Sequence, residues 1–87
     1  FDLTIYHMPG HSPGHLVIAC QNHLFTGDLL FRGTVGTTDT FGGSQVDLHR
    51  SLSSLLAWPD ETLVHPGHGP ATSIGAEREN ILNRLGL

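Results

Sequence analysis

Residues 15–28, HLVIACQNHLFTGD, form the segment that decides the fold of this chain. An apolar run over 15–20 and a shorter one over 23–26 are separated by the polar pair Gln21-Asn22. Two such runs joined by two turn-forming residues predict a β-hairpin. The second run leads into Thr-Gly-Asp, so the carboxylate of Asp28 is expected at the exit of a strand.

The flanking segments continue this alternation of strands and loops. Phe1–Tyr6 alternates apolar and polar residues, which predicts a half-buried strand, and Thr62–His65 predicts a short buried one. Met8–Gly14 and Pro66–Pro70 are loops, because both are rich in Pro-Gly turn signals. Gly33–Ser44 holds glycines and threonines with few apolar groups, which predicts an extended surface loop.

Two helices are expected in the second half of the chain. The first starts at about Val46, is capped by Ser44 and is ended by Pro59. The second covers roughly Gly75–Leu85, with acidic residues near its positive N-terminus. The side chains expected to face the core recur at helical spacing: Leu48, Leu52, Leu55 and Leu56, then Ile81, Leu82 and Leu85.

The predicted element order is β, β, β, α, β, α, which indicates an α/β layer fold. Two amphipathic helices can cover only one face of a sheet. The other face is therefore expected to be open to solvent unless something else packs on it.

Composition narrows the class of protein. The chain has 87 residues, room for one small domain, and it begins at Phe1, so we expect the natural start of the gene product to lie elsewhere. Its net charge is −4 and it has no lysine, which argues against nucleic acid as a partner. No apolar run approaches the roughly 20 residues needed to span a membrane. Cys20, the only cysteine, is expected to be a small core residue and suits a reducing, cytoplasmic location.

Seven histidines in so short a chain favour a metal site. His11, Asp28 and His68 each follow a predicted strand, where ligands gather in α/β sheets. Imidazole and carboxylate together suit zinc, iron or manganese. Singly, each has a plainer explanation, because an aspartate after Thr-Gly often bonds its own backbone and a histidine in a Pro-Gly loop is often solvated. Their joint occurrence at three strand ends favours metal binding.

Three strings in this order, PGHSPGH over 9–15, FTGDLLF over 25–31 and PGHG over 66–69, resemble the second half of the metallo-β-lactamase superfamily. The likeness is greatest to its short single-domain hydrolases similar to glyoxalase II, and it covers nearly the whole chain. It implies half of an αββα sandwich, a mixed sheet with two helices on one face. Residues 1–87 would then be the C-terminal half of the domain, with the N-terminal half absent.

The resemblance also implies a role for individual residues. His11 would bind the first of two divalent metal ions, most often zinc, with iron or manganese as alternatives. Asp28 would bridge both metals and position the nucleophile as the catalytic residue, and His68 would bind the second metal. His15 would hydrogen-bond behind the ligands. The remaining histidines are expected to be structural: His7, His23, His49 and His65.

The chain departs from the family pattern because it lacks the His-x-His-x-Asp-His motif that supplies the other ligands. Each metal would receive only two donors here, fewer than the three or four of firm zinc sites. The function implied is a fragment of a hydrolase that cleaves a small-molecule thioester or ester with metal-bound hydroxide, inactive without its N-terminal half. We expect no glutathione-binding helical extension of the kind found in larger glyoxalase II enzymes, so the resemblance does not by itself imply specificity for a thioester.

Two alternatives remain. The first is a self-associating half-domain without enzymatic activity, a homodimer through the exposed sheet face with at most an adventitious metal site. The second is a histidine-rich module that binds metal through His7, His11 and His15.

Overall fold

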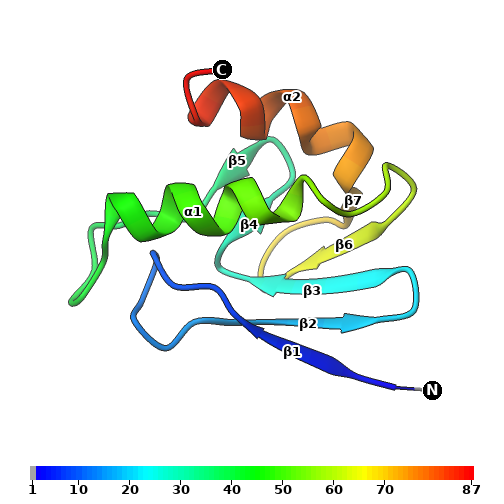
Figure 1. The fold of residues 1–87 in the computed structure, drawn as a ribbon, viewed down its shortest axis with the longest axis horizontal. Coiled ribbons are helices and arrows are strands. Elements are labelled where there is room, and N and C mark those ends of the chain that lie inside the picture. Colours follow the sequence, from blue (N-terminus) through cyan, green and yellow to red (C-terminus); the bar gives the residue numbers. More distant parts are fainter. Residues whose placement is uncertain (1) are drawn as a thin grey trace.

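The computed structural model describes residues 2–87, so Phe1, the first residue of the expected N-terminal strand, lies outside the described residues. Five strands form one mixed sheet in the order β1-β2-β3-β6-β7 (Figure 1). They are β1 (Thr4–His7), β2 (Leu16–Cys20), β3 (His23–Gly27), β6 (Leu63–Pro66) and β7 (Thr72–Ser73). A separate two-stranded ribbon and two helices complete the fold: β4 (Leu30–Phe31), β5 (Thr34–Val35), α1 (Gln45–Leu55) and α2 (Ile74–Arg84).

The predicted hairpin is confirmed. Ile18 of β2 pairs with Phe25 of β3, and Cys20 pairs with His23 in an antiparallel ladder. Gln21 adopts a positive φ of 55°, as two-residue hairpin turns require. β1 is also antiparallel to β2, whereas β6 is parallel to β3, because the chain returns through α1 between them.

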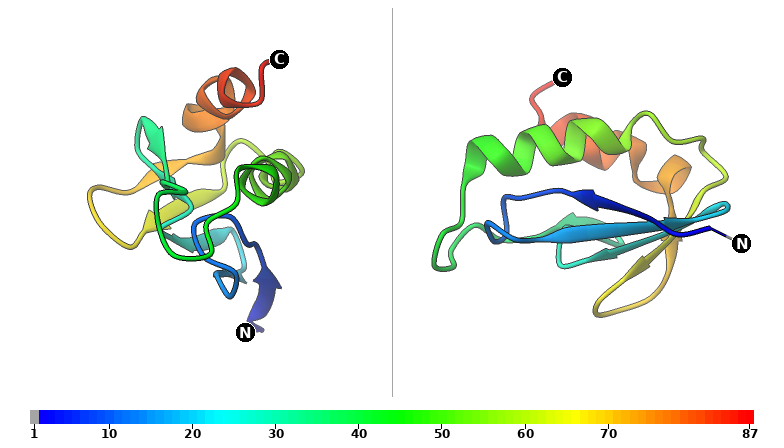
Figure 2. Two further views of the ribbon diagram at one scale, coloured as in Figure 1. Left: turned by 90° about the vertical axis from the view of Figure 1, so that its left-hand side faces the viewer. Right: turned by 60° about the horizontal axis from the view of Figure 1, so that its bottom comes forward.

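Both helices pack on the same face of the sheet, as expected (Figure 2). Their buried side chains meet inward-facing residues of the central strands in one core: Met8, Val17, Leu24, Leu29, Leu30, Leu48, Leu52, Leu55, Val64, Ile74 and Ile81. Ser44 caps α1 by accepting a hydrogen bond from the amide of Asp47 at 3.2 Å, and α1 ends before Pro59. Neither helix among the described residues is long and apolar enough to cross a membrane.

The opposite face of the sheet carries apolar side chains that no layer of residues 2–87 covers. Ile5 pairs with Ile18, Ile18 with Phe25, and Phe25 with His65, so these four residues form one row across the sheet. We call this row the open face. Ile5 is 61% exposed and Phe25 45% exposed. β1 was predicted to be half-buried, and that prediction is wrong because its apolar side points away from the helices.

Cys20 also differs from expectation. By its register with His23 it lies on the same side of the sheet as Ile18, and it is a free, partly exposed thiol that does not belong to the core.

Three two-residue strands, β4, β5 and β7, were not predicted. The segment 33–44, predicted as loop, contains β5, which pairs with β4 so that Leu30 lies opposite Val35. Both residues pack on the core, which explains why this part of the segment is not an open loop. α2 begins at Ile74, and its buried residues are Ile74, Glu77 and Ile81, whereas the predicted inward residues Leu82 and Leu85 are only partly buried.

Candidate metal centre

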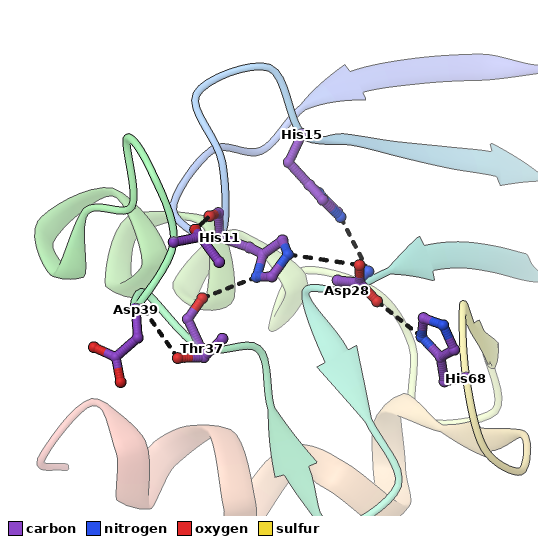
Figure 3. Close-up of polar contacts among 7 residues, drawn as sticks. His11, His15, Asp28, Thr37, Asp39 and His68 are labelled. Atoms are coloured by element: carbon purple, nitrogen blue, oxygen red, sulfur yellow. Dashed lines mark hydrogen bonds and ion pairs between the residues drawn. The ribbon is translucent and has the colours of Figure 1, made fainter.

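The sheet topology brings the three candidate ligands to one edge. β1 and β3 are each antiparallel to β2, and β6 is parallel to β3, so these three strands run in one direction. His11 lies in the loop after β1, Asp28 directly after β3 and His68 in the loop after β6. Figure 3 shows the three side chains pointing toward one another.

Asp28 lies between the two histidines. The His11 Nε2 atom is 3.5 Å from Asp28 Oδ2, and the His68 Nδ1 atom is 3.1 Å from Asp28 Oδ1. Each carboxylate oxygen therefore faces a different imidazole. The His11 side chain is 21% exposed and that of His68 is 81% exposed. His11 is therefore largely enclosed by other residues, whereas His68 projects into solvent.

Glycine and the backbone fix the position of Asp28. Gly27 has a φ of +54°, and a Cβ there would come within 2.9 Å of the His15 Nε2 atom. The amide of Asp28 donates a hydrogen bond to that same nitrogen at 3.1 Å (Figure 3). The amide of Gly67 donates to the Gly27 carbonyl at 2.8 Å and so joins the ends of β3 and β6.

His15 therefore makes the expected hydrogen bond next to the candidate ligands, to the backbone of Asp28. Because its Nε2 accepts a hydrogen bond, that nitrogen is unprotonated in the neutral ring and Nδ1 carries the hydrogen. The Nδ1 atom is buried and has no hydrogen-bond partner among the described residues. Burial lowers the pKa of His15 below its usual value, and the neighbouring His11 lowers it further, whereas the Asp28 carboxylate opposes the shift. The site thus favours the neutral imidazole.

His11 is oriented by a contact that the sequence did not reveal. Its Nδ1 donates to the main-chain carbonyl of Thr37 at 2.9 Å, which leaves Nε2 facing Asp28 (Figure 3). The Thr37 hydroxyl in turn accepts from the amide of Asp39 at 3.0 Å. No sequence signal could have identified Thr37, because any residue has a carbonyl.

The other histidines make their contacts elsewhere. His7 donates to the Pro13 carbonyl, His49 bonds Gln45 on the same helix, and His23 bonds His65 at 2.9 Å on the open side of the sheet. Within residues 2–87 no three His, Cys, Asp or Glu side chains are grouped so as to hold a metal ion. This finding argues against the histidine-rich module, and it means that His11, Asp28 and His68 are not a complete metal site by themselves either.

The donor atoms of His11, Asp28 and His68 suit part of a metal centre. Imidazole nitrogen and carboxylate oxygen are ligands that zinc, iron and manganese accept. The Nε2 lone pair of neutral His11 and the Asp28 Oδ2 atom face each other at 3.5 Å, an arrangement that a bound cation would stabilise. With Asp28 shared, each of two metals would have one histidine and one carboxylate oxygen from this chain.

The sequence of this chain is similar to a known protein family and to bacterial proteins. The family model described as the metallo-beta-lactamase superfamily matches residues 1–71. The "Probable metallo-hydrolase YqgX" of Bacillus subtilis is 40% identical over all of this chain, which covers 44% of that protein. The "Hydroxyacylglutathione hydrolase GloC" of Haemophilus influenzae is 39% identical over 92% of this chain, which covers 39% of it. The chain thus spans about two fifths of the length of these relatives.

Solved structures give the same result. The protein TTHA1623, solved in a di-iron-bound form, matches 87% of this chain with a TM-score of 0.85 and 49% identity, and this chain covers 39% of it. ETHE1 from Myxococcus xanthus matches 97% of this chain with a TM-score of 0.88 and 34% identity, and 40% of that protein is covered. Together with the family match, the mixed sheet and the helices on one face, these findings show that the chain belongs to the metallo-beta-lactamase superfamily.

Proposed function

We propose that this chain supplies one half of the active site of a metal-dependent hydrolase that cleaves a thioester or ester. The observation that carries the proposal is the placement of Asp28 between His11 and His68, with one carboxylate oxygen toward each imidazole. The remaining ligands would come from a further part of a longer protein, and the 87-residue chain would be inactive without them.

Each residue has a separate task in this proposal. His11 and Asp28 would hold one metal, and Asp28 and His68 the other. When bound, such a metal pair activates water and polarises a carbonyl oxygen. Asp28 would orient the pair because each of its oxygens faces a different imidazole, and His15 holds the Asp28 backbone so that the carboxylate keeps its direction.

Names of relatives support the choice of substrate and metal. One relative is called a hydroxyacylglutathione hydrolase, which favours a small thioester over other substrates. Zinc suits the donor set, and iron is the alternative because TTHA1623 has been solved in a di-iron-bound form.

A hybrid protein tests the proposal. The segment of the Bacillus subtilis relative that corresponds to this chain, 44% of its length, is replaced by residues 1–87. The hybrid is expected to hydrolyse a hydroxyacylglutathione thioester, whereas the chain alone is not. Asp28→Ala in the hybrid is expected to lower kcat/KM by more than about a hundredfold. Loss of a residue that only hydrogen-bonds to a metal ligand lowers activity by at most about that factor.

The matched control is His49→Gln, because His49 lies on α1 and bonds only Gln45. This variant should leave the rate unchanged. A folded, metal-loaded hybrid with no hydrolysis of thioester or ester, or one that is active with Ala at position 28, contradicts the proposed function.

The open face supports a second candidate of another class. An exposed apolar row on a sheet favours association. A self-associating half-domain with no enzymatic activity would bury this row against a second copy of the chain.

A further inference from the structure

The segment 36–43 lies against the Asp28 backbone with no room for a side chain at Gly36, and it folds back on itself with no room for one at Gly43. A Cβ added to Gly36 would lie 1.9 Å from the carbonyl oxygen of Asp28, and one added to Gly43 would lie 2.0 Å from the carbonyl oxygen of Thr38. Such approaches are impossible for any residue other than glycine. The amide of Gly36 also donates to the Leu29 carbonyl at 2.9 Å, so the start of the segment is fixed to the backbone that carries Asp28.

The end of the same segment is attached to the loop that carries His11. The hydroxyl of Thr40 donates to the main-chain carbonyl of His11, and the amide of Ser44 donates to the Gly10 carbonyl at 2.9 Å. A Cβ at Gly42 would come within 2.7 Å of the Pro13 side chain, which shows that the two loops are in close contact. The segment therefore joins the His11 loop to the Asp28 backbone.

Between these attachments lies the carbonyl of Thr37, which receives the His11 Nδ1 hydrogen at 2.9 Å. A carbonyl only accepts hydrogen bonds, so this contact requires the hydrogen on Nδ1. The lone pair of the neutral ring is then on Nε2, the atom 3.5 Å from Asp28 Oδ2. A metal ligand needs that lone pair, and a partner on the second ring nitrogen is what selects the tautomer.

We propose that the segment 36–43 is a positioning element for His11, in which the Thr37 carbonyl selects the Nδ1–H tautomer and directs Nε2 toward Asp28 before any metal binds. Thr37 acts through its main chain, and Gly36 acts by allowing the segment to lie against the Asp28 carbonyl. The consequence for metal affinity rests on the proposed function. The tautomer itself is a property of the metal-free chain.

The test is a long-range ¹H–¹⁵N NMR spectrum of the metal-free 87-residue chain, labelled with ¹⁵N in its histidines, at a pH of about 8, above the ordinary pKa of a histidine side chain. His11 is expected in the Nδ1–H form, with Nε2 showing the shift of an unprotonated nitrogen. A wild-type His11 in the Nε2–H form, or averaging between both forms, overturns the proposal, whatever the variants do.

Two variants test whether the segment 36–43 determines the tautomer of His11. In Gly36→Ala, His11 is expected to lose its preference for the Nδ1–H form. The dissociation constant for Co²⁺, measured by adding Co²⁺ to the same NMR sample, is expected to rise by about tenfold or more. If Gly36→Ala does not fold, Thr40→Val, which removes only the hydroxyl bond to the His11 carbonyl, should produce the same change to a smaller extent. A folded Gly36→Ala chain with an unchanged His11 tautomer contradicts the proposal.

The matched control is Gly14→Ala, because a Cβ there meets nothing within 4 Å and Gly14 does not have a positive φ. Its His11 signals should equal those of the wild type. The tautomer can be correct while the hybrid protein fails to hydrolyse a thioester, so failure of this inference and failure of the proposed function are distinguishable.

Discussion

Asp28 is fixed through its backbone by one imidazole and faces two others with its carboxylate. Removing the His15 contact would free the aspartate to rotate away from His11 and His68. The neutral state of His15 is part of this arrangement, because a protonated ring could not accept the Asp28 amide hydrogen.

The lowered pKa of His15 predicts a pH-dependent contribution to stability. Below a pH of about 6.5 the unfolded chain binds a proton at His15 that the folded chain resists, so stability falls as the pH drops through this range. The free energy of unfolding, measured with urea at pH 7.5 and pH 5.5, should decrease more in the wild type than in His15→Gln, whose amide does not titrate. Equal decreases in both proteins would contradict this assignment.

The sequence allowed prediction of the side chains at the centre but not of the contacts that orient them. The order of the Gly-His, Gly-Asp and Gly-His motifs pointed to His11, Asp28 and His68, and the fold brings these three together. The Thr37 carbonyl and the Asp28 amide act through main-chain atoms that every residue has. Their partners depend on how the loops fold, which residue types alone do not specify.

Among the helices and strands, α2 contains a buried acid that joins three elements. The Glu77 carboxylate accepts hydrogen bonds from the amide of Gly33, between β4 and β5, at 2.9 Å and from the hydroxyl of Thr72 in β7 at 2.7 Å. The sequence placed Glu77 near the positive end of the helix, and it is in addition buried, with 4% exposed. Glu77 therefore holds the ribbon that follows Asp28.

Glu77→Ala should lower the free energy of unfolding by about 2 to 3 kcal/mol, because it removes the charged acceptor that the Gly33 amide and the Thr72 hydroxyl share. Glu79→Ala is the matched control, since Glu79 is an exposed acid on the same helix, and its effect should stay within about 0.5 kcal/mol. Urea denaturation measures both. Equal effects would show that the Glu77 contacts do not stabilise the fold.

The elements missed in the sequence are those too short to show a period. β4, β5 and β7 have two residues each, and two residues cannot reveal an alternation. The alternation in β1 was detected, but the sequence does not specify which side of the sheet the helices cover. That is why Ile5 was expected to be half-buried and is exposed.

For the molecule as a whole, the open face predicts association of the isolated chain. Light scattering at increasing concentration should show a mass above that of one 9.4 kDa chain. Phe25→Glu should restore the monomer because it places a charge in the middle of the apolar row. Phe41→Glu, at a fully exposed position outside that row, should not. A folded wild-type monomer at all concentrations contradicts self-association.

We propose that His11, Asp28 and His68 together form part of a two-metal centre. The most direct test of this proposal is the metal content of the folded hybrid with the Bacillus subtilis relative, measured by elemental analysis after dialysis. Two ions per hybrid are expected, with loss of both in Asp28→Ala because each metal would share this carboxylate, and with fewer than one ion retained by the 87-residue chain alone. A folded Asp28→Ala hybrid that still retains two ions would contradict it.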